Sequence, residues 1–254
     1  MRQPTDRVIV FDLDDTLYLE RDYAVSGFRA AAASVFAHDP RLALRFASAC
    51  QRLFAAGLRG SIFDEALRHC EIDVDPDLVA RLIAAYRGHR PNIVLAPDAE
   101  RYLISRPAGL RSAIITDGPA ASQEGKIAAL GLGPRMDKIL CTAHLGQGFS
   151  KPHPKAYQVV ADWARVAPEQ LVYVADNPAK DFVTPRKMGW MTVQIVRAGR
   201  IHLQEAPDPG HAAHRMITSF DDFDACLDAL DSEHDRAEGR PAASGYYPQR
   251  EARF

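Results

Sequence analysis

The sequence predicts an α/β protein with a Rossmann-like, doubly wound parallel sheet and an inserted α-helical cap subdomain. Short apolar, β-rich runs recur along the chain, and segments with helical spacing separate them. Strands that alternate with helices in this way form right-handed crossovers, which cover a parallel sheet on both faces. An interval of roughly one hundred residues between the first two runs is too long for one crossover helix.

Five runs have the continuous apolar pattern of strands that are buried on both faces. They are residues 8–11, 111–116, 138–141, 171–175 and 191–196. Helical spacing between them predicts helices over residues 120–130, 154–166 and 179–188. These elements form the sheet and its covering layers.

The long interval after the first run carries apolar residues at helical spacing, for example Val25, Phe28 and Val35. We therefore expect a cap of about four helices over residues 20–92. The core comprises residues 1–19 and 93–231, with one further helix over 98–106. Residues 232–254 lack periodicity and are rich in Gly, Pro, Ser and Ala, so we expect a disordered tail rather than a partner-binding one.

Composition narrows the class of partner. The 254 residues include 31 basic and 33 acidic ones, and this balance argues against binding to nucleic acid or anionic lipid. The four cysteines are far apart, which favours neither a disulfide framework nor a zinc site. No signal peptide and no run of apolar residues long enough for a membrane helix are visible. We expect a soluble cytoplasmic protein with a small-molecule partner; the oligomeric state stays open.

Three carboxylates, Asp12, Asp14 and Asp15, follow the first strand directly. Ligands of open α/β sheets bind beyond the carboxyl ends of the strands, so these residues are expected at the mouth of the site. Asp12 and Asp14 can project to the same side, where their charges repel unless a cation or a shared proton relieves them. Asp15 is expected to cap the following helix or turn.

Other strand ends bring complementary groups to the same edge. The hydroxyl of Thr116 and the backbone N–H groups of Asp117 and Gly118 suit phosphate oxygens. Asp176, Asp181 and Lys151 add two acids and a cation. Carboxylates that converge without His or Cys favour Mg²⁺, which is usually held by one or two carboxylates and substrate phosphate.

In this order the motifs resemble those of the haloacid dehalogenase superfamily of hydrolases. DLDDT at residues 12–16 is similar to the first motif, Thr116 in ITDG to the second and Lys151 in SKPHP to the third. Asp176 and Asp181 in ADNPAKD are similar to the fourth motif, where Ala175 replaces a frequent glycine. The likeness covers residues 8 to about 196, with the insertion where the family places a helical C1 cap.

This resemblance implies a role for each matching residue. Asp12 would be the nucleophile that forms an aspartyl-phosphate, and Asp14 the general acid and then the general base. The Asp12 carboxylate, the Asp14 backbone carbonyl and Asp176 would hold Mg²⁺, and Asp181 would orient metal-bound water or Lys151. Thr116 and Lys151 would hold the phosphoryl oxygens.

Asp14 also indicates the reaction type, because the dehalogenases of this family lack an aspartate at that position. The sequence therefore favours phosphate-ester chemistry over cleavage of a carbon–halogen bond. We expect a Mg²⁺-dependent phosphomonoesterase acting on a small phosphorylated metabolite, such as a sugar phosphate or a nucleotide. A phosphomutase with the same motifs, and a catalytically silent scaffold or regulatory protein, are the alternatives.

Overall fold

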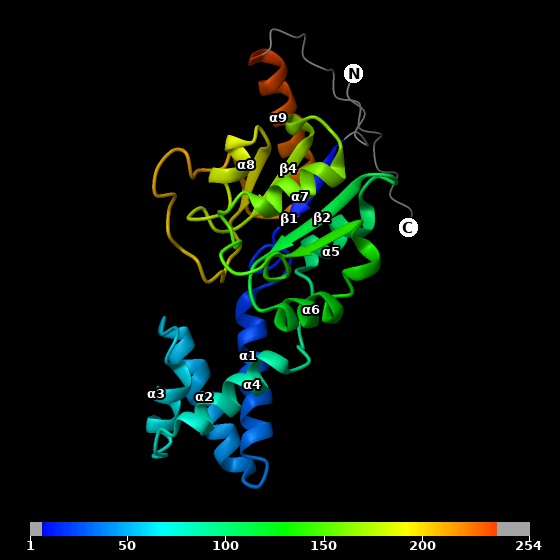
Figure 1. The fold of residues 1–254 in the computed structure, drawn as a ribbon. Coiled ribbons are helices and arrows are strands. Elements are labelled where there is room, and N and C mark those ends of the chain that lie inside the picture. Colours follow the sequence, from blue (N-terminus) through cyan, green and yellow to red (C-terminus); the bar gives the residue numbers. More distant parts are fainter. Residues whose placement is uncertain (1–6, 238–254) are drawn as a thin grey trace.

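The core is a six-stranded parallel sheet in the order β3-β2-β1-β4-β5-β6 (Figure 1). The structure is a computed structural model and describes residues 7–237. Its strands are β1 (Val8–Phe11), β2 (Arg111–Thr116), β3 (Lys138–Cys141), β4 (Leu171–Ala175), β5 (Met191–Ile195) and β6 (Arg215–Ile217). The first five are the predicted strands, whereas β6 was not predicted because its three residues are too few for a pattern.

Alternate residues of the strands supply two apolar layers. Ile9 and Phe11 face one layer, and Val8 and Val10 face the other. The first layer is completed by α5 (Pro97–Ser105), α6 (Ala120–Ala129) and α9 (Phe223–Ala237), and the second by α7 (Lys155–Ala164) and the residues around α8 (Val183–Lys187). Burial on both faces confirms the predicted doubly wound α/β class.

One core helix starts later than its sequence pattern indicates. Helicity was expected from residue 179, but α8 begins at Val183. The Asn177 side chain accepts a hydrogen bond from the backbone N–H of Ala179, and the Asp181 carboxylate accepts one from the N–H of Asn177. These local bonds stabilise a turn in place of the first helical turn.

The inserted segment forms four helices that make a separate body in Figure 1, joined to the core by two chain segments. They are α1 (Glu20–Val35), α2 (Pro40–Ala55), α3 (Ile62–His69) and α4 (Pro76–Gly88). The side chains of Asp39 and Asp75 cap α2 and α4, each followed by a proline at the first helical position. Buried side chains such as Phe28, Phe46 and Leu82 give the cap its own apolar core.

The Asp15 side chain forms hydrogen bonds with both the cap and the core. Its carboxylate accepts hydrogen bonds from the backbone N–H of Glu20, the first residue of α1, at 2.9 Å and from that of Ile201 at 2.6 Å. The two connecting segments also meet, because the Ala96 N–H donates to the Leu17 carbonyl at 2.9 Å. Asp15 therefore binds the first N–H of the helix that it was predicted to cap, although the N-cap residue of α1 itself is Leu19.

The expectation of a disordered tail from residue 232 onward is wrong for residues 232–237, because α9 runs to Ala237. Leu227 and Leu230 of this helix are buried against the sheet, and farther along Glu233 pairs with Arg215 of β6. The rest of the expected tail, 238–254, lies outside the described residues. Within residues 7–237, no helix is both long and apolar enough to cross a membrane.

Candidate active site

Asp12 stands at the centre of the sheet edge. It follows β1, and its N–H donates to the Val174 carbonyl at 2.8 Å, so the strand geometry positions its side chain. The residue is 4% exposed. Burial raises the pKa of Asp12, while the charge of Lys151 opposes the shift and that of Asp181 adds to it.

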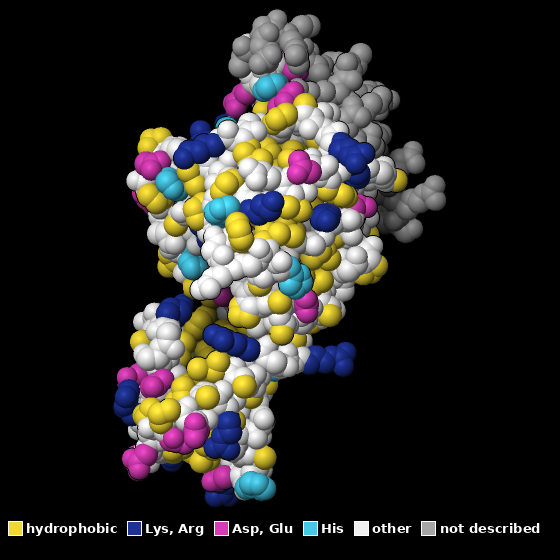
Figure 2. Space-filling model, viewed as in Figure 1, with side chains coloured by type: hydrophobic (Ala, Val, Ile, Leu, Met, Phe, Trp, Pro, Cys, Tyr) yellow, Lys and Arg dark blue, Asp and Glu magenta, His cyan; other side chains and the backbone are white. Residues whose placement is uncertain are grey.

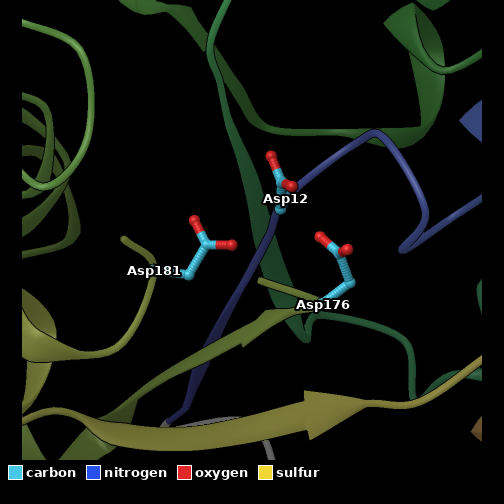
Figure 3. A group of neighbouring side chains, drawn as sticks. All are labelled: Asp12, Asp176 and Asp181. Carbon is cyan, nitrogen blue, oxygen red and sulfur yellow. The ribbon is translucent and has the colours of Figure 1, made fainter. Parts of the chain in front are cut away.

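Asp12, Asp176 and Asp181 come from separate segments and extend their carboxylates toward the same space (Figure 3). One carboxylate oxygen from each lies within 4.8 Å of the others. Asp176 follows β4, and its Oδ2 is buried without a hydrogen-bond partner among the described residues. Burial first, and then the charges of Asp12 and Asp181, raise the pKa of Asp176 to about 9. Such crowded and unpaired oxygens fit a divalent cation with a preference for oxygen ligands.

Lys151 supplies the positive charge beneath this cluster. Its Nζ donates to Asp12 Oδ1 at 2.8 Å and to the Tyr173 hydroxyl at 3.0 Å, and lies 2.8 Å from Asp181 Oδ1. Burial disfavours the charged amine, but Asp12 and Asp181 outweigh it and raise the pKa of Lys151 above its usual value. Because Asp181 is occupied by Lys151 and by the N–H of Asn177, it is better placed to orient Lys151 than to bind a metal directly.

The predicted phosphate-binding residues reach the same edge of the sheet, but the side chain of Thr116 does not face the cavity. Thr116 is fully buried, and its hydroxyl donates to Gln123 Oε1 at 3.1 Å, so this side chain does not line the cavity. Asp117 and Gly118 do line it. The Asp117 carboxylate accepts hydrogen bonds from the Lys151 N–H at 3.1 Å and from Lys180 Nζ at 3.1 Å.

The backbone conformation at Gly118 favours glycine. Its φ is +130°, and a Cβ there would lie 2.5 Å from Gln123 Nε2. The same Nε2 donates to the Asp117 carbonyl at 2.7 Å. Gln123 therefore packs against the loop that presents the backbone N–H groups of residues 117 and 118.

Asp14 lies apart from the carboxylate cluster. Its oxygens accept hydrogen bonds from Lys126 Nζ at 2.7 and 2.9 Å and one from the Tyr18 hydroxyl. The expectation that Asp14 contributes to a metal site thus receives no support from its side chain and rests on its backbone carbonyl. Its carboxylate lines the cavity, as a group that exchanges a proton with a substrate must.

Several cavity residues carry no motif and were missed by the sequence analysis. Gln123 and Lys126 lie three residues apart on α6, a spacing that places them on one face. That face was the available signal, but it does not reveal that Lys126 meets Asp14. Lys180 lies inside the fourth motif, at a position that the motif leaves open, and the aromatic and acidic cap residues gave no signal.

The cavity between core and cap has a volume of about 300 Å³. Its floor includes Asp12, Asp117, Gly118 and Asp176. The cap side is lined by Glu20, Tyr23, Tyr86 and Arg87, with Ser122 and Lys126 from α6 and His202 from the loop after β5. A space of this size, at the small end of ligand cavities, suits a substrate of few atoms.

A parallel sheet that gathers carboxylates and a lysine at its carboxyl edge, beneath a helical cap, defines an α/β enzyme that acts on a small ligand. Residues 7–189 match the haloacid dehalogenase-like hydrolases. This match covers well over half of the chain, which therefore belongs to that family.

Individual proteins agree with this assignment. A glyceraldehyde 3-phosphate phosphatase from Methanocaldococcus jannaschii is 29% identical over 198 residues, which are 74% of this chain and 84% of that protein. A phosphoserine phosphatase from Thermus thermophilus is 32% identical over 157 residues, 61% of each chain. The expectation of a phosphatase-type hydrolase is thereby confirmed.

Solved structures share the fold. A predicted phosphoglycolate phosphatase from Haemophilus somnus has a TM-score of 0.62 at 19% identity, over 88% of this chain and 98% of that one. A HAD family hydrolase from Deinococcus radiodurans with bound phosphate and sodium has a TM-score of 0.60 at 19% identity. The likeness covers 90% of this chain and 97% of that one. At these identities the likeness concerns the fold alone.

Proposed function

We propose that this protein is a Mg²⁺-dependent phosphomonoesterase that hydrolyses a small phosphorylated metabolite through an aspartyl-phosphate on Asp12. The observation that carries the proposal is the buried cluster of Asp12, Asp176, Asp181 and Lys151, two of which, Asp12 and Asp176, line a small cavity. Relatives named as phosphatases of three-carbon phosphates support the class of substrate.

The residues present fit Mg²⁺. The unpartnered Oδ2 of Asp176 and the carboxylate of Asp12 are hard oxygen donors that would hold the ion, together with the backbone carbonyl of Asp14. When bound, Mg²⁺ neutralises negative charge on the phosphoryl group and on Asp12. Asp181 would act through Lys151 and through ordered water.

In the first chemical step, a carboxylate oxygen of Asp12 forms a bond to phosphorus as the ester P–O bond breaks. The electron pair of that bond goes to the leaving oxygen, which takes a proton from the Asp14 carboxyl group. Lys151, 2.8 Å from Asp12 Oδ1, holds the nucleophile in place. The backbone N–H groups of Asp117 and Gly118 would hold phosphoryl oxygens.

In the second step, a water molecule attacks the phosphorus of the aspartyl-phosphate and gives a proton to the Asp14 carboxylate. The bond between phosphorus and the Asp12 oxygen breaks, which restores the Asp12 carboxylate and releases inorganic phosphate. Asp14 returns to its protonated form and is ready for the next ester. The cap limits the access of other water molecules to the intermediate.

Release of inorganic phosphate from a panel of small phosphomonoesters with Mg²⁺ tests this proposal. We expect Asp12→Asn to lower the rate by about a thousandfold or more, since a nucleophile is removed. Asp162→Asn, on the exposed surface of α7, is the matched control and should keep full activity. Phosphorus NMR of the products separates hydrolysis from the phosphomutase alternative, which would return an isomeric ester. Full activity of Asp12→Asn would overturn the proposal.

A further inference from the structure

The cap side of the cavity contains polar groups that the proposed chemistry does not use. Tyr23, Tyr86 and Arg87 come from α1 and α4 and line the same space as Asp12. Figure 2 shows basic side chains beside the hollow at the junction of the two bodies. These groups lie where the leaving group of a phosphomonoester would sit, because the cap faces the carboxyl edge of the sheet.

Within residues 7–237, Tyr23 carries an unpaired buried hydroxyl on this side of the cavity. It is 5% exposed, and its hydroxyl has no hydrogen-bond partner among the described residues. Its ring is held by Tyr86, with centroids 5.6 Å apart, and by Lys126, whose Nζ lies 4.2 Å from the ring centroid. A buried hydroxyl without a partner is costly, so an acceptor from a substrate is expected to complete it.

The charges on this side sum to a positive value. Lys180 pairs with Asp117, and Lys126 pairs with Asp14. Because Asp14 is protonated when the ester binds in the proposed first step, Lys126 then adds a positive charge to this side. Burial raises the pKa of Glu20, so its carboxyl group carries less negative charge near neutral pH than an ordinary glutamate. The net charge of the side chains on the cap side of the cavity is therefore positive.

Arginines add to that positive charge. Arg87 is exposed at the cavity wall and forms no ion pair within residues 7–237. The charge of Arg59 also acts on two cavity residues, Tyr86 and His202. An arginine fork binds a carboxylate with two parallel hydrogen bonds and keeps its charge at any working pH.

Resting on the proposed function, we propose that the cap side binds a carboxylate at the far end of a short phosphomonoester, through Arg87 and the hydroxyl of Tyr23. The cavity of about 300 Å³ has room for the phosphoryl group and for a short carbon chain that ends in a carboxylate. Tyr86 adds a hydroxyl to the same space, whereas the Ser122 hydroxyl donates to the Arg87 carbonyl at 3.2 Å. The substrate class is therefore a phosphorylated short-chain hydroxy acid.

Calorimetric binding to the full chain carrying Asp12→Asn, with Mg²⁺ present, separates recognition from turnover. The probes are 3-phosphoglycerate, glycerol 3-phosphate, phosphoethanolamine and 2,3-bisphosphoglycerate. We expect 3-phosphoglycerate to bind about tenfold more tightly than glycerol 3-phosphate, the effect of one hydrogen-bonded charge. Adding Tyr23→Phe or Arg87→Met should remove most of this preference.

Two matched variants control for general damage. Tyr102→Phe removes a hydroxyl from the core, and Arg81→Met removes an exposed arginine of the same helix α4. Both should keep the tenfold preference. Equal binding of 3-phosphoglycerate and glycerol 3-phosphate, or tightest binding of phosphoethanolamine or of the bisphosphate, would overturn the proposal. If the preference holds but the wild-type chain releases no phosphate from any ester, the proposed function fails while the carboxylate site stands.

Discussion

Two buried lysines show how differently the two sides of the cavity are built. Lys151 pairs with Asp12 at 2.8 Å, and Lys126 pairs with Asp14 at 2.7 Å. The other partners of Lys151, Asp181 and Tyr173, belong to β4 and the turn after it. Lys126 instead lies over the ring of Tyr23, which belongs to the cap. The floor is thus made by strand ends of one sheet, whereas the cap side depends on how two bodies meet.

The largest expected effect is on the floor. Lys151→Met leaves Asp12 and Asp181 buried together without their cation, so we expect a loss of about 3–5 kcal/mol in the free energy of unfolding. Phosphate release should fall below detection. Urea denaturation measures the first effect. A loss under 1 kcal/mol would show that the floor does not depend on Lys151.

Mg²⁺ should stabilise the same floor. A ligand that binds only the folded state adds about 2.7 kcal/mol when present at one hundred times its dissociation constant. We expect a rise in melting temperature with Mg²⁺ that Asp176→Asn removes and that Asp162→Asn keeps. An equal shift in the Asp176→Asn protein would place the ion elsewhere.

Lys126→Met tests the cap side. The substitution removes two hydrogen bonds from the Asp14 carboxylate. Because that carboxylate is partly exposed to solvent, we expect a loss of about 1–3 kcal/mol in the free energy of unfolding. Because Asp14 is no longer held at the leaving oxygen, kcat should fall about tenfold to a hundredfold. The comparison of the two lysines breaks down if Lys126→Met is as destabilising as Lys151→Met.

The smallest effect concerns the connection between the bodies. Arg197 donates to the Thr16 carbonyl at 2.7 Å and to the Asp98 carboxylate at 2.9 and 3.1 Å. Burial alone would raise the pKa of Asp98, but the hydrogen bonds from Arg197 and from the Phe220 N–H outweigh it and lower the pKa. The lowered pKa means that ionised Asp98 stabilises the folded state. This contribution is fully present above the pKa of Asp98 in the unfolded chain, near 3.9, and is lost as the pH falls through its lower pKa in the folded chain.

Urea denaturation between pH 5 and pH 3 measures this loss. We expect Asp98→Asn to be less stable than the wild-type chain at pH 5 and to lose less stability on acidification. Parallel curves for the two proteins would mean that Asp98 titrates alike in the folded and unfolded states.

Local sequence patterns were sufficient to predict most strands of the sheet. β1 to β5 were predicted because strands buried on both faces are continuous apolar runs between polar segments. β6 was missed because Arg-Met-Ile has no such run, and α8 was expected too early because the Asn177 turn competes with the helix. The helical end of α9 was missed because its support comes from tertiary contacts, such as the ion pair of Glu233 with Arg215.

The candidate site likewise contains residues that sequence motifs predict and contacts that only the structure reveals. Asp12, Asp176, Asp181 and Lys151 were named from motifs at strand ends, and the structure brings them together. Thr116 reaches the edge, but its hydroxyl is bound by Gln123, a contact between residues seven apart that no motif marks.

The sequence by itself determined the class of fold and the residues at the floor, since strand order and the position just after each parallel strand bring those side chains to one edge. Only the tertiary structure decided the partners of Asp14 and the composition of the cap side. Lys126, Tyr23 and Arg87 lie on different helices, and they share a cavity only once the cap has docked on the core. Helical periodicity specifies which face is apolar, but not which polar group that face will meet.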